Sequence, residues 1–232
     1  MKRCFDLIAS LAALTVLSPI LLLAAIGIRL SSRGPVIFRA ERAGKNGVPF
    51  VMHKFRTMRC NAGKDASRIT SHADNRVFAV GKILRILKID ELPQLYDVLL
   101  GAMSIVGPRP EDAKIVRDHY APEHWQTLTV RPGLASPGSI YNYTHGERLL
   151  DPENPERAYL EKLLPVKLAL DAVYVREASF LYDLRIIGRT LAVVVQIAFG
   201  RRDFPDPPEM AKIDRVVPAR NIPASLPLEE IS

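Results

Sequence analysis

The sequence predicts a mostly helical α+β protein that begins with a membrane-embedded helix. Three observations predict it: an uncharged apolar run near the N-terminus, one pair of segments with the pattern of a β-hairpin, and several later stretches with helical spacing. The 232 residues are 48% hydrophobic and 25% charged, which argues against disordered and collagen-like classes. A chain of this length suits one domain, or one domain with an appendage.

The apolar run covers 22 residues, from Leu7 to Ile28, without a charge. At ~1.5 Å per residue, a helix of this length reaches across a ~30 Å hydrocarbon core. A spanning helix or an uncleaved signal anchor is the simplest interpretation. A cleaved signal peptide is disfavoured, because no clear small-x-small cleavage site follows and Arg29 and Arg33 come next.

Two features of this run favour a helix that enters one leaflet and returns. Ser18 and Pro19 lie near its middle, and a proline inside a helix removes a backbone hydrogen bond and produces a kink. The Ser18 hydroxyl is suited to satisfy the carbonyl that is freed. The positive-inside rule keeps both ends cytoplasmic, since both are flanked by basic residues. These are Lys2 and Arg3 before the run, and Arg29, Arg33, Arg39, Arg42 and Lys45 after it. The residues alone leave the re-entrant and spanning arrangements open.

The positive charge of the chain is concentrated around this run. Lys and Arg number 32 against 25 Asp and Glu, a net charge of +7, and residues 1–60 alone hold ten basic and two acidic residues. This distribution favours a membrane surface or a phosphorylated substrate as partner, and not nucleic acid. The two cysteines, Cys4 and Cys60, argue against a disulfide framework or a cysteine-rich zinc site and fit a reducing compartment.

After the run, the pattern predicts a hairpin followed by helices. Residues 36–55 have the pattern of two strands around the turn-forming residues 44–47, and a polar surface loop is expected at 59–76. Residues 82–89 mix apolar and basic side chains at near-helical spacing, which suits an anionic membrane surface, although a solvated helix face is commoner. Further helices are expected at 92–100, at 154–176 with a break at Pro165, and at 190–199 as a core or interfacial segment. Residues 204–232 hold six of the 18 prolines and are expected to form an extended tail.

The adjacent acids Asp90 and Glu91 are the first candidates for chemistry. Neighbouring acids are most often solvated surface residues, but here apolar residues lie on both sides, and Arg85 and Lys88 are close in sequence. Two carboxylates in such surroundings can divide the work, one as a nucleophile and the other as the ligand of a divalent cation.

Several cations are candidates for binding phosphate. Arg109 stands between Pro108 and Pro110 on a stiff loop, which suits bidentate phosphate binding. Arg131 has the same character, and Lys54 and Arg56 lie at the end of the second expected strand. Asp171 and Tyr174 share one face of an expected helix, and a surface pair is the simplest interpretation. The histidines show no metal spacing, and the sequence holds no Walker loop, nucleophile elbow or Rossmann glycine pattern.

Taken together, eight short stretches resemble the bacterial sugar transferases, the small monotopic phosphoglycosyl transferases. Their order and spacing make the resemblance specific, and it runs from Lys2 to about Gly200. The stretches are Lys2-Arg3-x-x-Asp6, the apolar run with Ser18-Pro19, Arg33-Gly34-Pro35-Val36-Ile37-Phe38, Glu41-Arg42-x-Gly44, Lys54-Phe55-Arg56-Thr57-Met58, Asp90-Glu91-Leu92-Pro93-Gln94-Leu95, Met103-Ser104-x-Val106-Gly107-Pro108-Arg109-Pro110 and Arg131-Pro132-Gly133.

The resemblance implies a re-entrant membrane helix in residues 1–32 and a catalytic domain in 33–202, with a tail in 203–232. The catalytic domain would be mostly helical with a small β element, and amphipathic helices would hold it on the cytoplasmic face of the bacterial inner membrane. The implied activity is transfer of a sugar-1-phosphate from a UDP-sugar to polyprenyl (undecaprenyl) phosphate, with release of UMP. This is the first membrane step in the synthesis of exopolysaccharide, O-antigen, capsule or glycoprotein glycans.

The resemblance also implies roles for individual residues. Asp90 would be the nucleophile that carries the phospho-sugar, Glu91 would hold Mg²⁺, and the loop Pro108-Arg109-Pro110 would bind the nucleotide. Further candidates for binding the anionic substrates are Lys54, Arg56, Arg85 and Arg131.

One stretch departs from the commonest family pattern. After Gly133 many members continue T-G-W-x-Q-V-x-G-R, whereas this chain reads L-A-S-P-G-S-I-Y from Leu134 to Tyr141, as in a subgroup of the family. The change is expected to affect the substrate pocket, so the sugar stays open, as do the glycan pathway and a homo-oligomeric state. Two alternatives also stay open: a membrane-attached glycosyltransferase that releases UDP, and a non-catalytic membrane adaptor.

Overall fold

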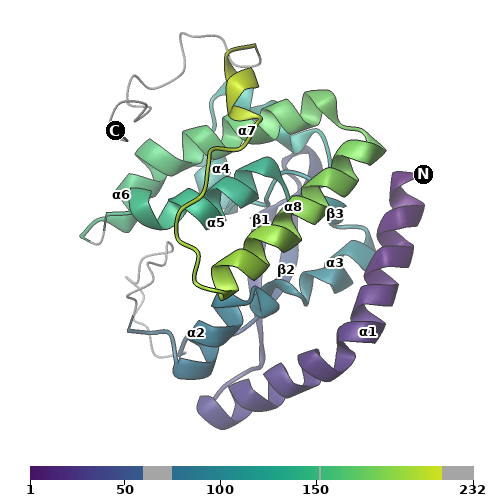
Figure 1. Ribbon diagram of the computed structural model, residues 1–232, viewed down its shortest axis with the longest axis vertical. Helices are drawn as coiled ribbons and strands as arrows, with labels where there is room; N and C mark the ends of the chain where they lie inside the picture. The colour runs from purple at the N-terminus through teal and green to yellow at the C-terminus, as the bar shows by residue number, and fades with distance from the viewer. Residues whose placement is uncertain (60–74, 152, 216–232) are drawn as a thin grey trace.

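The computed structural model describes residues 1–59, 75–151 and 153–215, so most of the predicted surface loop and the end of the predicted tail lie outside the described residues. The fold is mostly helical with two small sheets, as predicted (Figure 1). Its helices are α1 (Lys2–Ser31), α2 (Ala79–Ile86), α3 (Gln94–Leu100), α4 (Ala113–His119), α5 (Pro137–Leu149), α6 (Pro155–Ala158), α7 (Leu164–Glu177) and α8 (Phe180–Ala198). Its strands are β1 (Ile37–Ala43), β2 (Pro49–Phe55), β3 (Ser104–Val106) and β4 (Gly133–Ala135).

Helix α1 is continuous but bent. Figure 1 shows its two arms running in different directions, and Pro19 lies inside it. Because proline has no N–H, Pro19 leaves the Thr15 carbonyl without its helical partner. Ser18 Oγ donates to this carbonyl at 2.8 Å, which confirms the role predicted for the hydroxyl. Within the described part of the chain, α1 is the one helix long and apolar enough to cross a membrane.

Both ends of α1 contact the same folded body. At the N-terminal end, Lys2 Nζ lies 2.5 Å from Asp183 Oδ2, and Ser104 Oγ donates to Asp6 at 2.8 Å. At the other end, Ile28 is fully buried in an apolar cluster. The other buried members of this cluster are Ala24, Phe55, Phe78 and Leu84. The exposed apolar side chains of α1 therefore lie between two anchored ends.

The predicted hairpin is confirmed. Strand β1 pairs antiparallel with β2 in a register that runs from Ile37 opposite Phe55 to Ala43 opposite Pro49. The connection contains Asn46 with φ 58° and Gly47 with φ 75°, a left-handed conformation that glycine and asparagine tolerate best.

A short parallel sheet brings two of the sequence motifs together. Strand β3 pairs with β4, and Gly107, which follows β3, lies against Gly133, which begins β4. A Cβ atom on Gly133 would lie 2.1 Å from the Gly107 nitrogen, so this approach requires glycine. The contact sets the loop that carries Arg109 beside Arg131-Pro132.

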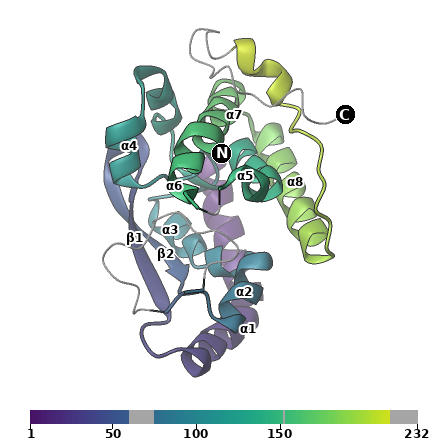
Figure 2. The same ribbon diagram turned by 90° about the vertical axis from the view of Figure 1, so that its left-hand side faces the viewer.

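Helix α7 is the central helix of the main body. A single π-helical turn, Tyr159–Leu163, leads directly into it, and Pro165 lies in its first turn. The predicted break at Pro165 is wrong, because the chain stays helical from Pro155 to Glu177 and only the type of helix changes just before the proline. Figure 2 shows the hairpin on one side of the molecule and α5, α7 and α8 on the other.

The interpretation of Asp171 and Tyr174 as a surface pair is wrong. Both side chains are buried, because α7 is surrounded by other elements over most of its circumference.

The described part of the predicted tail is not extended throughout. Residues Met210–Arg215 form a 3-10 helix, and Ile213 is buried against the core around α7. Glu209 is also buried and accepts a hydrogen bond from Arg189 Nη1 at 2.6 Å. This segment therefore packs on the core despite its prolines, because the Ile213 side chain and the ion pair between Glu209 and Arg189 attach it there.

Candidate active site

Asp90 and Glu91 lie in a short 3-10 helix, Ile89–Glu91, between α2 and α3. Lys88, just before it, has a left-handed φ of 55°, so the chain changes direction where α2 has ended. Pro93 stands at the start of α3, where its missing N–H removes no helical bond. Asp90 and Glu91 are only 8% and 7% exposed, so they are not solvated surface acids.

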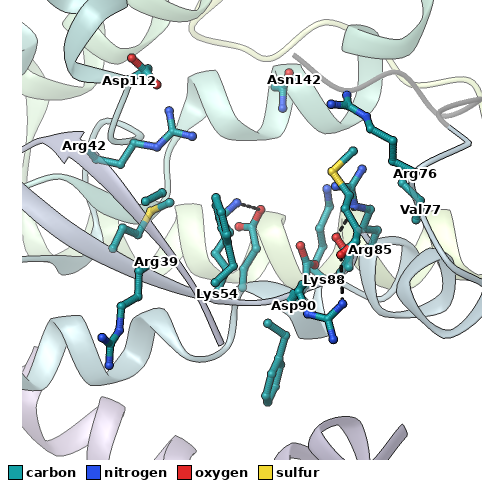
Figure 3. A pocket seen from close by; sticks show the side chains of 18 of the residues that line it. Arg39, Arg42, Lys54, Arg76, Val77, Arg85, Lys88, Asp90, Asp112 and Asn142 are labelled. Atoms are coloured by element: carbon teal, nitrogen blue, oxygen red, sulfur yellow. Dashed lines mark hydrogen bonds and ion pairs between the residues drawn. The ribbon is translucent and has the colours of Figure 1, made fainter. Parts of the chain in front are cut away.

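The two carboxylates border a cavity of about 1230 Å³, which the hairpin, α2, α4 and α5 also line (Figure 3). In the close view, Lys54, Arg85 and Lys88 gather around Asp90, while Arg42, Asp112 and Asn142 lie across the cavity. Its basic lining residues include Arg39, Arg42, Lys54, Arg76, Arg85 and Lys88. This concentration of positive charge around two acids suits a polyanionic ligand.

Glu91 is held by four hydrogen-bond donors. Arg109 approaches it as a fork, with Nη1 at 2.9 Å from Oε2 and Nη2 at 2.5 Å from Oε1. Tyr143 Oη donates to Oε2 at 3.1 Å, and Lys54 Nζ to Oε1 at 3.4 Å. Burial raises the pKa of Glu91, but Arg109 and Lys54 outweigh this effect and hold the pKa well below its usual range. These contacts therefore favour the ionised form of Glu91.

Asp90 has a different environment. Its Oδ1 atom is buried and has no hydrogen-bond partner among the described residues. Burial, and then the charge of Glu91, raise the pKa of Asp90. Burial also lowers the pKa of both Lys54 and Lys88. An unsatisfied buried carboxylate oxygen is rare and calls for an explanation, and here its residue lines a cationic cavity, which is where a nucleophile or a ligand is expected.

The structure brings only some of the predicted residues to this site. Lys54 and Arg109 contact Glu91, and Arg85 lines the cavity while its Nε donates to Thr57 Oγ1 at 2.8 Å. Arg131 is exposed, and its Nε donates to the Gly101 carbonyl at 2.9 Å. The substrate-binding roles of all these residues stay predictions.

Arg56 lines the large cavity, but its guanidinium is already engaged. Nε donates to the Pro35 carbonyl at 2.5 Å, and Nη2 to the Ser32 carbonyl at 2.8 Å. Nη1 reaches Ser32 Oγ at 2.8 Å as well. These bonds attach the end of α1 to the end of β2, so Arg56 has a structural role in addition to any contact with substrate.

Sequence reasoning missed the contribution of α5. Asn142, Tyr143, Gly146 and Leu150, all within or just after this helix, line the large cavity. They follow directly after the stretch from Leu134 to Tyr141 that departs from the commonest family pattern, and that departure was the available signal. Tyr143 also supports the cations, because Lys88 Nζ lies 3.8 Å from the centre of its ring.

The position of Arg109 depends on a second buried acid that sequence reasoning did not assign to the site. Asp171 accepts a hydrogen bond from the Arg109 N–H at 3.3 Å and from the Gly138 N–H at 2.9 Å. It therefore links the loop of Arg109 to the start of α5. Burial raises the pKa of Asp171 from 3.8 to about 6, against the opposing effect of these donors.

This shift predicts how stability depends on pH. The folded state binds the Asp171 proton more tightly than the unfolded state does. The free energy of unfolding therefore falls as pH rises from about 4 to about 6, where Asp171 loses its proton in the folded protein. A shift of this size corresponds to about 3 kcal/mol between acidic and neutral pH. Asp171→Asn cannot ionise, so its unfolding temperature in detergent should improve relative to wild type between pH 4.5 and 7.5. Parallel stability curves for the two proteins would contradict the assignment.

Magnesium was expected on Glu91, and the donor set tests this expectation. A carboxylate offers about four acceptor positions, and four donors approach Glu91. In this arrangement Glu91 does not fit a metal ion, because a donor would have to leave first. Asp90 Oδ1 is the free carboxylate oxygen. No group of three or more metal-ligating side chains occurs in the described residues.

Comparison with known proteins agrees with this geometry. The family model for bacterial sugar transferases matches residues 1–197. The UDP-glucose:undecaprenyl-phosphate glucose-1-phosphate transferase of Caulobacter vibrioides is 38% identical over 82% of this chain and 68% of its own length. The exopolysaccharide production protein PSS of Rhizobium leguminosarum is 37% identical over 87% of this chain and 97% of its own length.

A third relative acts on a different sugar. The UDP-N-acetylgalactosamine-undecaprenyl-phosphate N-acetylgalactosaminephosphotransferase of Aeromonas hydrophila is 34% identical over 87% of this chain, which spans 45% of that protein. The family match covers the apolar helix, the hairpin, the two buried acids and the loop of Arg109. The chain therefore belongs to the bacterial sugar transferase family, a family of enzymes.

Proposed function

We propose that this protein transfers a sugar-1-phosphate from a UDP-sugar to undecaprenyl phosphate, releases UMP, and forms a covalent intermediate on Asp90. The observation that carries the proposal is the buried, unpaired Oδ1 of Asp90 in a cavity lined by cations. The printed activities of the relatives from Caulobacter vibrioides and Aeromonas hydrophila support the substrate classes.

The first half of the reaction makes an acyl phosphate. An Asp90 oxygen attacks the sugar-linked phosphorus of the donor, the bond from that phosphorus to the bridging oxygen breaks, and UMP leaves with the electron pair. A carboxylate and a pyrophosphate repel each other. Lys54, Lys88 and Arg85 offset this repulsion, because they lie around Asp90 in the same cavity.

The second half returns the enzyme to its starting state. An oxygen of the acceptor phosphate attacks the same phosphorus, and the Asp90–phosphorus bond breaks. Dividing the transfer into two displacements avoids bringing two multiply charged phosphates together at once, and it predicts ping-pong kinetics.

Arg109 would change partners during this cycle. In the present arrangement its fork binds Glu91, although its family role is nucleotide binding. A donor phosphate is tetrahedral but also offers two acceptor oxygens that a guanidinium fork can bind together, so Arg109 can exchange one for the other. Mg²⁺ on Glu91 remains a prediction and would require this exchange. Binding of Mn²⁺ followed by electron paramagnetic resonance, with and without UMP, tests it directly.

The membrane arrangement that suits this reaction is a re-entrant α1. The acceptor phosphate lies at the headgroup level, so the site must lie there as well. Support comes from the two anchored ends of α1, since the ends of a spanning helix would be separated by about 30 Å of hydrocarbon. Further support comes from exposed apolar side chains outside α1. They include Ile83, Ile86 and Leu87 around the end of α2 and Leu184, Leu191 and Val195 on α8.

Topology can be tested with the cysteine that α1 already carries. Cys4 is exposed near the N-terminal end, and a Cys60→Ser, Lys45→Cys variant adds a probe after the helix. In inverted and right-side-out vesicles, both cysteines should react with an impermeant maleimide only from the cytoplasmic face. Pro19→Leu restores a backbone N–H and should favour a straight, spanning helix. Reaction of Cys4 from the outer face in the Pro19 protein would contradict the re-entrant arrangement.

Product identity tests the function itself. The purified protein is incubated with a panel of UDP-sugars and undecaprenyl phosphate, and released nucleotides are separated. Repeated release of UMP that depends on the acceptor lipid, beyond the single equivalent released without it, supports the proposal. Release of UDP would instead indicate a glycosyltransferase that moves the sugar alone, and absence of turnover with every sugar would indicate a membrane adaptor.

A further inference from the structure

A smaller cavity of about 190 Å³ opens beside the site of Asp90 and Glu91. It shares part of its lining with the large cavity, including Arg42, Lys54 and Asn142, so the two cavities are direct neighbours. Arg109 lines the small cavity but not the large one. Because Lys54 and Arg109 both bind Glu91, the mouth of the small cavity lies next to the reacting centre.

The inner wall of the small cavity is a buried polar cluster formed by Glu111, Tyr159 and Lys167. Lys167 Nζ donates to Tyr159 Oη at 2.5 Å and to Glu111 Oε2 at 3.3 Å, and Tyr159 Oη donates to Glu111. The Asp112 N–H adds a bond to Glu111 Oε1 at 3.1 Å. The proposed reaction does not use these residues. A buried cluster that combines donors and acceptors at a cavity wall is typical of a binding site for hydroxyl groups.

Two observations indicate that this wall binds a ligand. Tyr159 begins the π-helical turn that precedes α7, and such turns are frequent at functional sites. Arg42 Nε, which also faces this cavity, is buried and has no acceptor among the described residues. It therefore has one hydrogen bond to offer an acceptor oxygen that is not part of the described protein.

The charges of the wall distinguish between possible ligands. Lys167 is paired with Glu111, and Arg42 Nη1 lies 3.7 Å from the same carboxylate. Burial raises the pKa of Glu111, but Lys167 and Tyr159 outweigh it, so the carboxylate stays ionised. The cavity lining holds four cations, Arg42, Lys54, Arg109 and Lys167, and two acids, Glu111 and Asp112, and a phosphate at the inner wall would lie against the Glu111 carboxylate. A neutral ligand with several hydroxyls meets both donors and acceptors.

We propose that the small cavity binds the sugar ring of the donor, with the hydroxyls farthest from the phosphate facing Glu111, Tyr159 and Lys167. This inference rests on the proposed function. The sugar is joined directly to the phosphorus that Asp90 attacks, so it must occupy space next to the reacting centre. Uridine is one phosphate farther away and larger, and the cavity of about 1230 Å³ is the space that can receive it.

The test separates sugar binding from nucleotide binding. Tyr159→Phe removes one hydroxyl and keeps the ring, and Asn142→Ala removes an amide from the shared wall. Thr144→Ala is the matched control on α5, because its hydroxyl bonds only within its own helix, to the Ile140 and Tyr141 carbonyls and to His145 Nδ1, and it lines neither cavity. For UDP-glucose and UDP-N-acetylgalactosamine, each cavity variant should raise KM at least threefold for one or both sugars and change the preference between them. Inhibition by UMP should stay as in wild type for Tyr159→Phe, because Tyr159 lines the small cavity and not the large one, and Thr144→Ala should change neither quantity.

Binding measurements keep the inference testable without turnover. In an Asp90→Asn background, calorimetry should show weaker binding of the same UDP-sugars to both cavity variants and unchanged binding of UMP to Tyr159→Phe. Because Tyr159 is buried, its variant is first compared with wild type by thermal unfolding, and Asn142→Ala serves if Tyr159→Phe does not fold. Equal weakening of UMP and UDP-sugar would overturn the sugar assignment in favour of a nucleotide pocket, and so would no effect on either ligand.

The two proposals fail in different ways. If wild type never releases UMP but the variants selectively weaken UDP-sugar binding, the transferase proposal fails and the sugar cavity stands. If UMP is released and the variants leave KM, sugar preference and binding unchanged, the cavity inference fails and the transferase proposal stands.

Discussion

Asp90→Asn should abolish both sugar-phosphate transfer and covalent labelling of the enzyme. Asparagine keeps the size of the side chain but has no attacking charge, and loss of a nucleophile commonly reduces turnover on the order of 10⁴-fold or more. Wild-type enzyme given a UDP-sugar labelled in the sugar, without acceptor, should gain at most one label per active site and release UMP. Adding undecaprenyl phosphate should move the label into the lipid fraction.

The controls for this experiment lie in the same cavity. Asp112→Asn makes the same chemical change on the far side of the cavity, and it keeps a good cap for α4, so this variant should still become labelled. Asp90→Glu should retain little activity, because a displacement of ~1 Å commonly costs ~10²-fold. Peptide mass spectrometry should find the adduct on Asp90. An adduct on another residue, or labelling that requires the acceptor, contradicts the assignment.

Single and double variants of Arg109 and Glu91 should differ in unfolding free energy but not in activity. Glu91→Gln leaves Arg109 and Lys54 without their carboxylate, and breaking a buried ion pair costs about 3 kcal/mol or more. Arg109→Gln leaves the Glu91 anion without its fork and should cost a similar amount. The double variant Glu91→Gln, Arg109→Gln removes both charges, so it should recover much of the unfolding free energy but none of the activity.

Arg109→Lys makes this prediction more specific. Lysine keeps the charge but cannot form two parallel hydrogen bonds, so turnover should fall while much of the stability remains. Chemical unfolding and UMP release, measured on all four variants, check both quantities. Recovery of activity along with stability in the double variant would mean that the pair only supports the fold. Wild-type turnover in Arg109→Lys would contradict a role for the fork.

Local patterns in the sequence predicted the elements whose cause is local. The hairpin follows from two apolar segments around a turn-forming sequence, and the turn residues Asn46 and Gly47 adopt the left-handed values that such a sequence requires. The position of Pro165 in the first turn of α7 also has a local cause, since the missing N–H of a proline is tolerated there. The bond from Ser18 to the Thr15 carbonyl follows from Pro19, because the proline and the carbonyl that it frees lie one turn apart.

Contacts between distant segments were less accessible from the sequence. Arg56 and Arg109 have the same charge but bind different partners. Arg56 donates to the Ser32 and Pro35 carbonyls, and Arg109 donates to the Glu91 carboxylate. Asp171 was interpreted as a surface residue because helical spacing alone does not say which neighbours cover a helix. The packing of α7 under its neighbours buries Asp171 and raises its pKa to about 6.

The sequence by itself determined the class of protein. A kinked apolar helix, a small hairpin and two adjacent acids in a family pattern each depend on residues that are close together in the chain. Only the tertiary structure decided which cations face those acids, that Asp90 Oδ1 has no partner in the described chain, and that Glu111, Tyr159 and Lys167 meet at one cavity wall. The physical reason is that periodicity and turn chemistry act over a few residues. Desolvation and charge pairing depend on which distant segments pack together.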